Sequence, residues 1–222
     1  MTEARFVPLA GYREYPPERM KERAASFRAD MQRRRSVRHF SSRPVPRRVI
    51  EDCILTAGSA PSGANMQPWH FVVVSAGRVK KRIREEAEKG EKEFYRRLAG
   101  REFLDALSGL GTDWRKPFLE EAPYLIVVFA RSKGLSPDGR QIKHYYVRES
   151  VGIAVGLLIA AIHNAGLAAL PYTPSRPIAL NEILERPESE RPFLVLVVGY
   201  PAEGAVVPDI NKKTLQEIAT FV

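Results

Sequence analysis

Four arginines crowd into the stretch RRRSVRHF, residues 33–40, just before a loop. Each carries a planar, permanently charged guanidinium group that can hold two phosphate oxygens at once. The pattern alone leaves three interpretations open: a solvated basic face, a site for a small phosphate-bearing anion, or a nucleic-acid surface. Few aromatic residues lie among the arginines, and no DNA- or RNA-binding motif surrounds them. This weakens the nucleic-acid interpretation and favours a small anion.

A second stretch, GSAPSGANMQPWHFVVV at 58–74, combines small residues and prolines with a β-branched run. Such a segment can bring backbone amides close to a flat or bulky group just before a buried strand. By itself it could equally be any loop that connects a helix to a strand.

Other kinds of site find little support. The four histidines lack the spacing of metal ligands, and the sequence has no CxxC, no GxSxG elbow and no phosphate loop of the GxxxxGK[ST] type. The single cysteine, Cys53, excludes an internal disulfide. Because Cys53 shares an apolar helical face with Ile50 and Ala57, we interpret it as a small buried residue rather than a reactive thiol.

Composition is that of an ordinary globular protein: 222 residues, 44% of them hydrophobic and 27% charged. The net charge of +9 favours anionic partners but says nothing about the fold. The first twenty residues lack the apolar core of a signal peptide, and the most apolar run, 151–162, is 12 residues long, where a membrane span needs about 20. We therefore expect a cytoplasmic protein without a membrane partner.

The elements that must position these residues follow from hydrophobic periodicity. Helices are predicted over 16–34, 47–60 and about 143–164, and a charged helical segment over 76 to about 110. Strands are predicted at 69–75, 122–130, 167–172 and 191–201. No repeat or domain boundary interrupts the pattern, which indicates a single domain over 1–222 with helices around one sheet.

The order and spacing of RRSVRHF, TAGSAPSGANMQPWHFVVV, HYYVRESVGIAVG, NAGLAALPYTP and VGYP resemble the FMN-dependent nitroreductase superfamily, and within it the iodotyrosine deiodinases. The resemblance runs from about Arg33 to Ile218. It implies an α+β fold with a central mixed sheet flanked by helices. It also implies an intertwined homodimer with FMN at the subunit interface, and a C-terminal arm, about 203–222, packed on the partner.

The resemblance also assigns FMN-binding residues. They are Arg34, Arg35, Ser36, Val37 and Arg38 at the phosphate and pyrimidine side, Ser62 and Gly63 from the opposing loop, Pro171, Tyr172 and Thr173 beside the ring, and Lys212 near the C-terminus. Thr173 is the expected catalytic residue, since its hydroxyl would bond flavin N5 and permit one-electron steps.

Two positions depart from the deiodinase pattern. Lys212 stands where the pattern has an arginine, and lysine keeps the charge but loses the bidentate fork. Pro171 replaces a hydroxyl residue and so lacks both a hydroxyl and a backbone N–H. The contacts at these two positions are expected to be weaker.

For the substrate, the resemblance implies a lid over about 80–117. Glu91 would bind the ammonium of a halotyrosine, Tyr95 and Lys116 its carboxylate, and the backbone N–H of Ala64 its phenolate. Glu91 and Tyr95 are four residues apart and so share a helical face. Without the resemblance, a solvated helix with incidental charges would be the favoured explanation.

The function implied is reductive dehalogenation of halotyrosines by FMN, with electrons from NAD(P)H or an unidentified flavin-reducing partner. The alternative is a broad-specificity NAD(P)H-dependent nitroreductase or quinone reductase, which does not need the Glu91, Tyr95 and Lys116 set. A flavin or nucleic-acid binder without catalysis is the rival of another class, although no nucleic-acid partner is expected.

Overall fold

The computed structural model describes residues 4–97, 99–136 and 138–222. Its internal contacts group the chain into two compact units, one ending at Arg34 and the other comprising Arg35–Val222. The first unit contains helix α1 (Pro17–Arg33), which begins with a proline, the residue best suited to a first helical turn. The helix predicted over 16–34 is thus present. Within this unit the guanidinium of Arg23 lies 4.6 Å from the centre of the Tyr15 ring.

The second unit is built on a four-stranded sheet. Its strands are β1 (Trp69–Val74), β2 (Tyr124–Arg131), β5 (Ala168–Tyr172) and β6 (Glu190–Gly199), in the order β1-β2-β6-β5. Neighbouring strands pair antiparallel, and a parallel bridge between Ser36 and Ala169 extends the sheet beyond β5. This confirms the predicted α+β fold with a mixed sheet, and each predicted strand is found.

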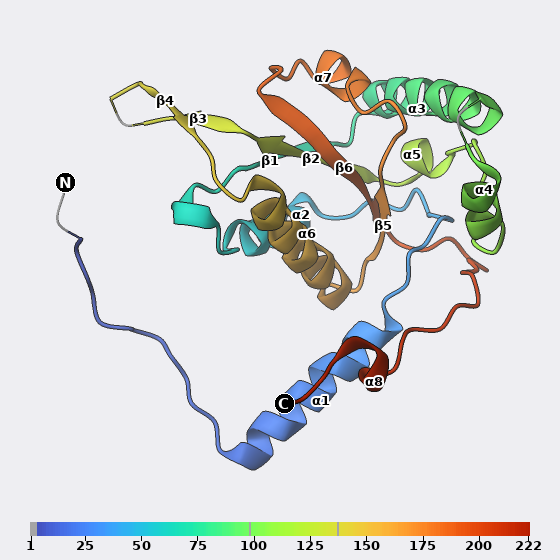
Figure 1. Ribbon diagram of the computed structural model, residues 1–222. Helices are drawn as coiled ribbons and strands as arrows, with labels where there is room; N and C mark the ends of the chain where they lie inside the picture. Colours follow the sequence, from blue (N-terminus) through green and yellow to red (C-terminus); the bar gives the residue numbers. More distant parts are fainter. Residues whose placement is uncertain (1–3, 98, 137) are drawn as a thin grey trace. The chain divides into compact units, whose positions relative to one another are not determined.

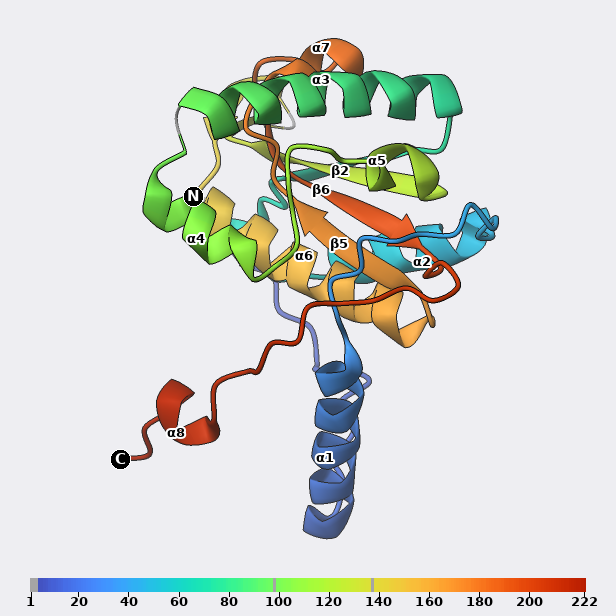
Figure 2. The same ribbon diagram turned by 90° about the vertical axis from the view of Figure 1, so that its right-hand side faces the viewer.

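Helices cover both faces of the sheet, as Figures 1 and 2 show from two directions. On one face lie α3 (Gly77–Arg97), α5 (Phe118–Glu121) and α7 (Ala179–Ile183). On the other lie α2 (Arg47–Gly58) and α6 (Val147–Asn164). The central strand β2 is therefore buried on both sides, and its residues 125–129 have no exposed surface. Its uninterrupted apolar sequence follows from this placement.

The face under α3 contains a core to which Ile83 and Ala87 contribute. Both belong to the segment 80–117 that was predicted to be a lid, so the first turns of this segment pack against the body of the protein. Arg101–Ser108 forms the separate helix α4 after Gly100, so the charged helical segment divides into two helices.

The opposite face packs α2 and α6 against the sheet. Cys53 is 4% exposed there, in a cluster with Ile50, Leu158 and Ile162. Among the described residues, α6 is the one helix whose length and composition would allow it to cross a membrane, but a third of its residues are buried inside this unit. We interpret α6 as a core helix.

Several short elements were not predicted. They are the short helices α5 and α7, the hairpin of β3 (Lys133–Leu135) and β4 (Gln141–Lys143), the 3-10 turn η1 (Gly63–Asn65), and α8 (Leu215–Ile218). Thr214 and Glu217 cap the N-terminus of α8 with a capping box. Because Lys143 belongs to β4, α6 begins at Val147, four residues later than predicted.

Candidate active site

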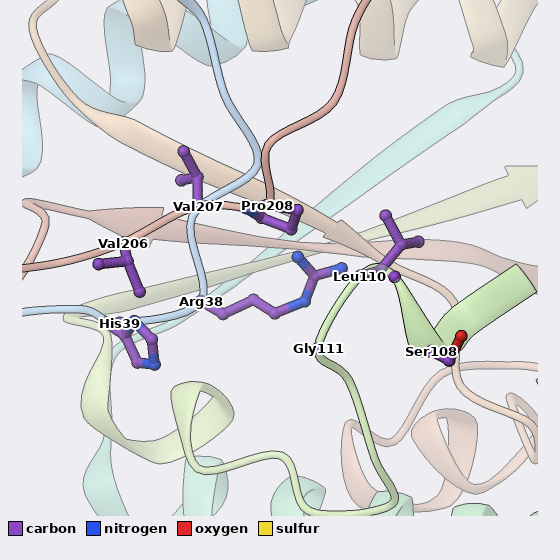
Figure 3. A pocket seen from close by; sticks show the side chains of 9 residues that line it. Arg38, His39, Ser108, Leu110, Gly111, Val206, Val207 and Pro208 are labelled. Carbon is purple, nitrogen blue, oxygen red and sulfur yellow. The ribbon is translucent and has the colours of Figure 1, made fainter.

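A cavity of about 370 Å³ lies where three segments of the second unit meet. It is lined by Arg38 and His39, by Ser108, Gly109, Leu110 and Gly111 after α4, and by Val206, Val207 and Pro208 near the C-terminus. Figure 3 shows the Arg38 side chain extended between Leu110 and Pro208. The volume is in the range of small-molecule and cofactor sites.

The sheet edge fixes the arginine segment. The Val37 N–H donates to the Ala169 carbonyl at 3.4 Å, and the Val37 side chain is buried in the core. Alternation along an extended chain then leaves Ser36 and Arg38 only half-buried. Farther along, the Ala202 N–H donates to the His39 carbonyl at 2.9 Å, which holds the C-terminal segment beside the arginines.

The residues around this cavity suit FMN. Arg38 lines the cavity and provides a cation that matches a phosphate, and Leu110 and Val207 provide apolar surface for a ring system. Arg35 and Ser36, which add a second cation and a hydroxyl, precede Arg38 in the same extended segment. The guanidinium of Arg35 also donates to the Pro208 carbonyl. Burial lowers the pKa of Arg38, but arginine stays charged at any physiological pH.

A second cluster brings together the three residues predicted to bind the amino-acid end of the substrate. Glu91 comes from α3, and Lys116 stands two residues before α5; both are buried, at 7% and 3% exposure. The Lys116 Nζ lies 3.7 Å from the Glu91 Oε2 and 5.7 Å from the centre of the Tyr95 ring. Residues 91, 95 and 116 thus converge on the face of the sheet covered by α3.

Neighbouring groups hold Lys116 in place. Its backbone N–H donates to the Glu88 carboxylate at 2.8 Å, and its ammonium donates to the Asp113 carbonyl. Burial lowers the pKa of Lys116, which Glu91 partly opposes, and burial raises the pKa of Tyr95. Sequence reasoning missed Glu88, although it lies three residues before Glu91 and therefore on the same helical face.

Tyr172 joins this cluster with its side chain. Its hydroxyl donates to the Glu91 Oε1 at 3.2 Å, and its ring packs edge-on against Phe118. Thr173 follows directly and is exposed. The flavin contacts expected of Pro171, Tyr172 and Thr173 stay predictions, as does that of Lys212, which is exposed before α8, and that of Arg34, the C-cap of α1.

The loop of Ser62, Gly63 and Ala64 has a strained backbone. Ala64, Asn65 and Gln67 all have φ near +50°, a conformation that costs energy for residues other than glycine. A Cβ on Gly63 would lie 2.8 Å from the Tyr146 ring, so only glycine fits there. Backbone strain of this kind is found most often where a ligand is held.

This loop lies apart from the other predicted site residues. The Gly63 N–H donates to the Ser150 hydroxyl at 3.3 Å, at the start of α6. It therefore belongs to the face of the sheet covered by α2 and α6, whereas Glu91 and Lys116 lie on the face covered by α3. A single chain does not unite the two groups of predicted residues.

Comparison with known proteins agrees with this fold. The model of the nitroreductase family matches residues 31–200, and the chain belongs to that family. Within the family, its relatives include the iodotyrosine deiodinase of Haliscomenobacter hydrossis, 55% identical over 94% of this chain and 93% of that protein. The iodotyrosine deiodinase of Nematostella vectensis is 44% identical over 97% of this chain and 83% of that protein.

A solved structure agrees as well. The crystal structure of oxidized iodotyrosine deiodinase bound to FMN and 3-iodo-L-tyrosine superposes with a TM-score of 0.76 at 33% identity. The match covers 88% of this chain and 100% of that chain.

Proposed function

We propose that this protein is an FMN-dependent oxidoreductase that removes halogen reductively from halotyrosines. The observation that carries the proposal is the cluster of two buried charges, Glu91 and Lys116, with the half-buried Tyr95. A carboxylate and an ammonium group side by side complement the ammonium and carboxylate groups of an amino acid. The identity of 55% to a deiodinase supports the same substrate class.

The residues of this cluster bind and orient the substrate. Glu91 binds the substrate ammonium, and Lys116 with the Tyr95 hydroxyl binds the carboxylate. Because both charged groups are almost fully buried, water is excluded from these contacts and each becomes stronger. The Ala64 N–H binds the phenolate oxygen, which fixes the ring that loses its halogen.

FMN would be held by the arginine segment, by the loop after α2, by the end of β5 and by the C-terminal segment. These residues are Arg34, Arg35, Ser36, Val37, Arg38, Ser62, Gly63, Pro171, Tyr172 and Lys212. When bound, FMN supplies the two electrons of the reaction. In the overall change a carbon–halogen bond is replaced by a carbon–hydrogen bond, two electrons and one proton are consumed, and halide leaves. Thr173 would contribute a hydroxyl group toward flavin N5.

A homodimer would complete the site. Ile153, on the outward face of α6, is 47% exposed, and a second subunit packed on this face would cover it. The loop 62–64 packs beside the same helix. A partner could therefore bring its own loop to the Glu91 side of this chain. We further propose a cytoplasmic protein reduced by NAD(P)H or a flavin-reducing partner.

The alternative is a broad-specificity NAD(P)H-dependent nitroreductase. It would use the same arginine segment for FMN. It would not require a buried acid–base pair matched to an amino acid, so the Glu91 and Lys116 pair favours the halotyrosine function.

Anaerobic reoxidation separates the two. The purified FMN-loaded protein is reduced with dithionite, 3-iodo-L-tyrosine is added, and flavin oxidation is followed together with free tyrosine. Prompt oxidation with one tyrosine formed per flavin is expected. Oxidation by a nitroarene or a quinone but not by iodotyrosine would establish the nitroreductase alternative.

A further inference from the structure

Tyr172 contacts Glu91 from a different element of the fold. It ends strand β5, 81 residues along the chain from Glu91, and its hydroxyl donates to the Glu91 Oε1 at 3.2 Å. The ring is locked against Phe118, with centroids 5.8 Å apart and planes at 73°. The ring contact helps to keep the hydroxyl beside the Glu91 carboxylate.

A second donor reaches the same carboxylate oxygen. The backbone N–H of Ser175 donates to the Glu91 Oε1 at 3.1 Å. The Oε2 atom faces Lys116 instead, 3.7 Å away. The two oxygens of Glu91 are therefore not equivalent, because the protein holds Oε1 through two donors and leaves Oε2 facing the cationic side of the cluster.

We propose that Tyr172 is a positioning residue that fixes the Glu91 carboxylate so that Oε2 is presented to the ammonium group of an α-amino acid substrate. This inference rests on the proposed function, since it deepens the role given to Glu91. Tyr172 can serve in this way because burial, followed by the nearby carboxylate of Glu91, raises the pKa of its hydroxyl. The hydroxyl keeps its proton and remains a donor at physiological pH.

The resulting specificity depends on one functional group of the ligand. A halotyrosine needs a correctly directed Glu91, whereas 3-(3-iodo-4-hydroxyphenyl)propanoate has the same ring and carboxylate but no ammonium. Loss of the Tyr172 hydroxyl should weaken the first ligand and spare the second. A merely structural role, through packing on Phe118 or contact with FMN, would affect both.

The test uses Tyr172→Phe, which removes the hydroxyl and keeps the ring. Titration calorimetry on the oxidised, FMN-loaded protein gives the dissociation constants of 3-iodo-L-tyrosine and of the propanoate. Iodotyrosine should bind about tenfold more weakly, the loss of one hydrogen bond to a charged group, while the propanoate constant changes less than about twofold. Tyr124→Phe, a half-buried tyrosine of strand β2 outside the site, is the matched control.

A double-mutant cycle gives the second measurement. Once Glu91→Gln has removed the carboxylate, adding Tyr172→Phe should weaken iodotyrosine binding little further. Additive losses in the cycle, or equal weakening of both ligands, would overturn the positioning role of Tyr172. Wild-type protein that contains FMN but binds no halotyrosine would instead overturn the proposed function itself.

Discussion

At the scale of single residues, the site holds two opposite charges almost out of contact with solvent. Lys116 and Glu91 lie 3.7 Å apart at 3% and 7% exposure. Burying either charge alone would be costly, so each serves as the counter-ion of the other. A zwitterionic ligand can replace this pairing by offering each residue a new partner of opposite charge, and the net charge of the buried cluster then stays constant.

As the pH is raised, iodotyrosine binding should therefore begin to weaken at a lower pH than it would if Lys116 had the pKa of an exposed lysine. Lys116 is charged only below its pKa, which burial lowers from the usual 10.5. Wild type should bind iodotyrosine more tightly than Lys116→Gln at neutral pH, by roughly tenfold. This advantage should disappear as the pH rises through the lowered pKa.

The measurement is the ratio of the two dissociation constants across pH, in which the ionisation of the ligand itself cancels. A ratio that stays constant up to pH 10.5 would show that the charge of Lys116 does not hold the ligand.

At the scale of elements, the site depends on the one-turn helix α5 and on Lys80, whose side chain caps the C-terminal end of that helix. The Lys80 Nζ, buried in α3, donates to the Glu120 carbonyl at 2.9 Å and to the Ala122 carbonyl at 2.7 Å, both at the end of α5. These carbonyls would otherwise lack helical partners. Lys80 thus fixes the short helix that begins two residues after Lys116.

Lys80→Met should lower the free energy of unfolding by about 1–3 kcal/mol, the cost of leaving buried carbonyls unsatisfied. It should also weaken iodotyrosine binding, because Lys116 loses its support. Denaturant unfolding measures the first effect and calorimetry the second. Lys81→Met, exposed on the same helix, is the control and should change neither. Equal stability of the two variants would contradict the capping role of Lys80.

Long elements could be predicted from the sequence because their pattern repeats. The helix at Arg47–Gly58 and strands β2 and β6 follow from periodicity and from continuous apolar runs. Helices of four or five residues, such as α5 and α7, are too short for a period to be detected. The start of α6 was misplaced because Tyr146 takes a left-handed conformation, with φ of 48°, at the junction with β4.

The site residues also differ in how far the sequence predicts them. Glu91 and Tyr95 share one helix, so their proximity follows from spacing. Lys116 was grouped with them only because of the resemblance to a family. The contact between the Tyr172 side chain and Glu91 was not predicted. The resemblance placed Tyr172 beside the flavin. Its contact with Glu91 could not be read from the sequence, because 81 residues separate the two and only the fold brings them together.

At the scale of the whole molecule, one chain leaves apolar surface uncovered and its site divided. The outward side of α6 includes Ile153, and the strained loop at Gly63 lies beside the same helix. A twofold dimer would resolve both, since each subunit would cover the α6 of the other.

Ile153→Asp should dissociate such a dimer and, with it, release FMN, because a charge would be forced into an apolar interface. Sedimentation gives the oligomeric state, and absorbance gives the flavin content. Val73→Asp places the same charge on another partly exposed aliphatic residue, in the edge strand β1, and should leave both unchanged. A variant at 153 that remains dimeric and yellow would exclude α6 as the interface.

The single thiol of Cys53 makes the chain its own reporter of local opening. Burial raises the pKa of this thiol, and α2 holds it against α6, so a thiol-specific dye cannot reach it until the two helices separate. The labelling rate in native buffer therefore measures how often α2 and α6 separate. If FMN and the dimer tie α6 in place, labelling should slow by orders of magnitude when the apoprotein is reconstituted.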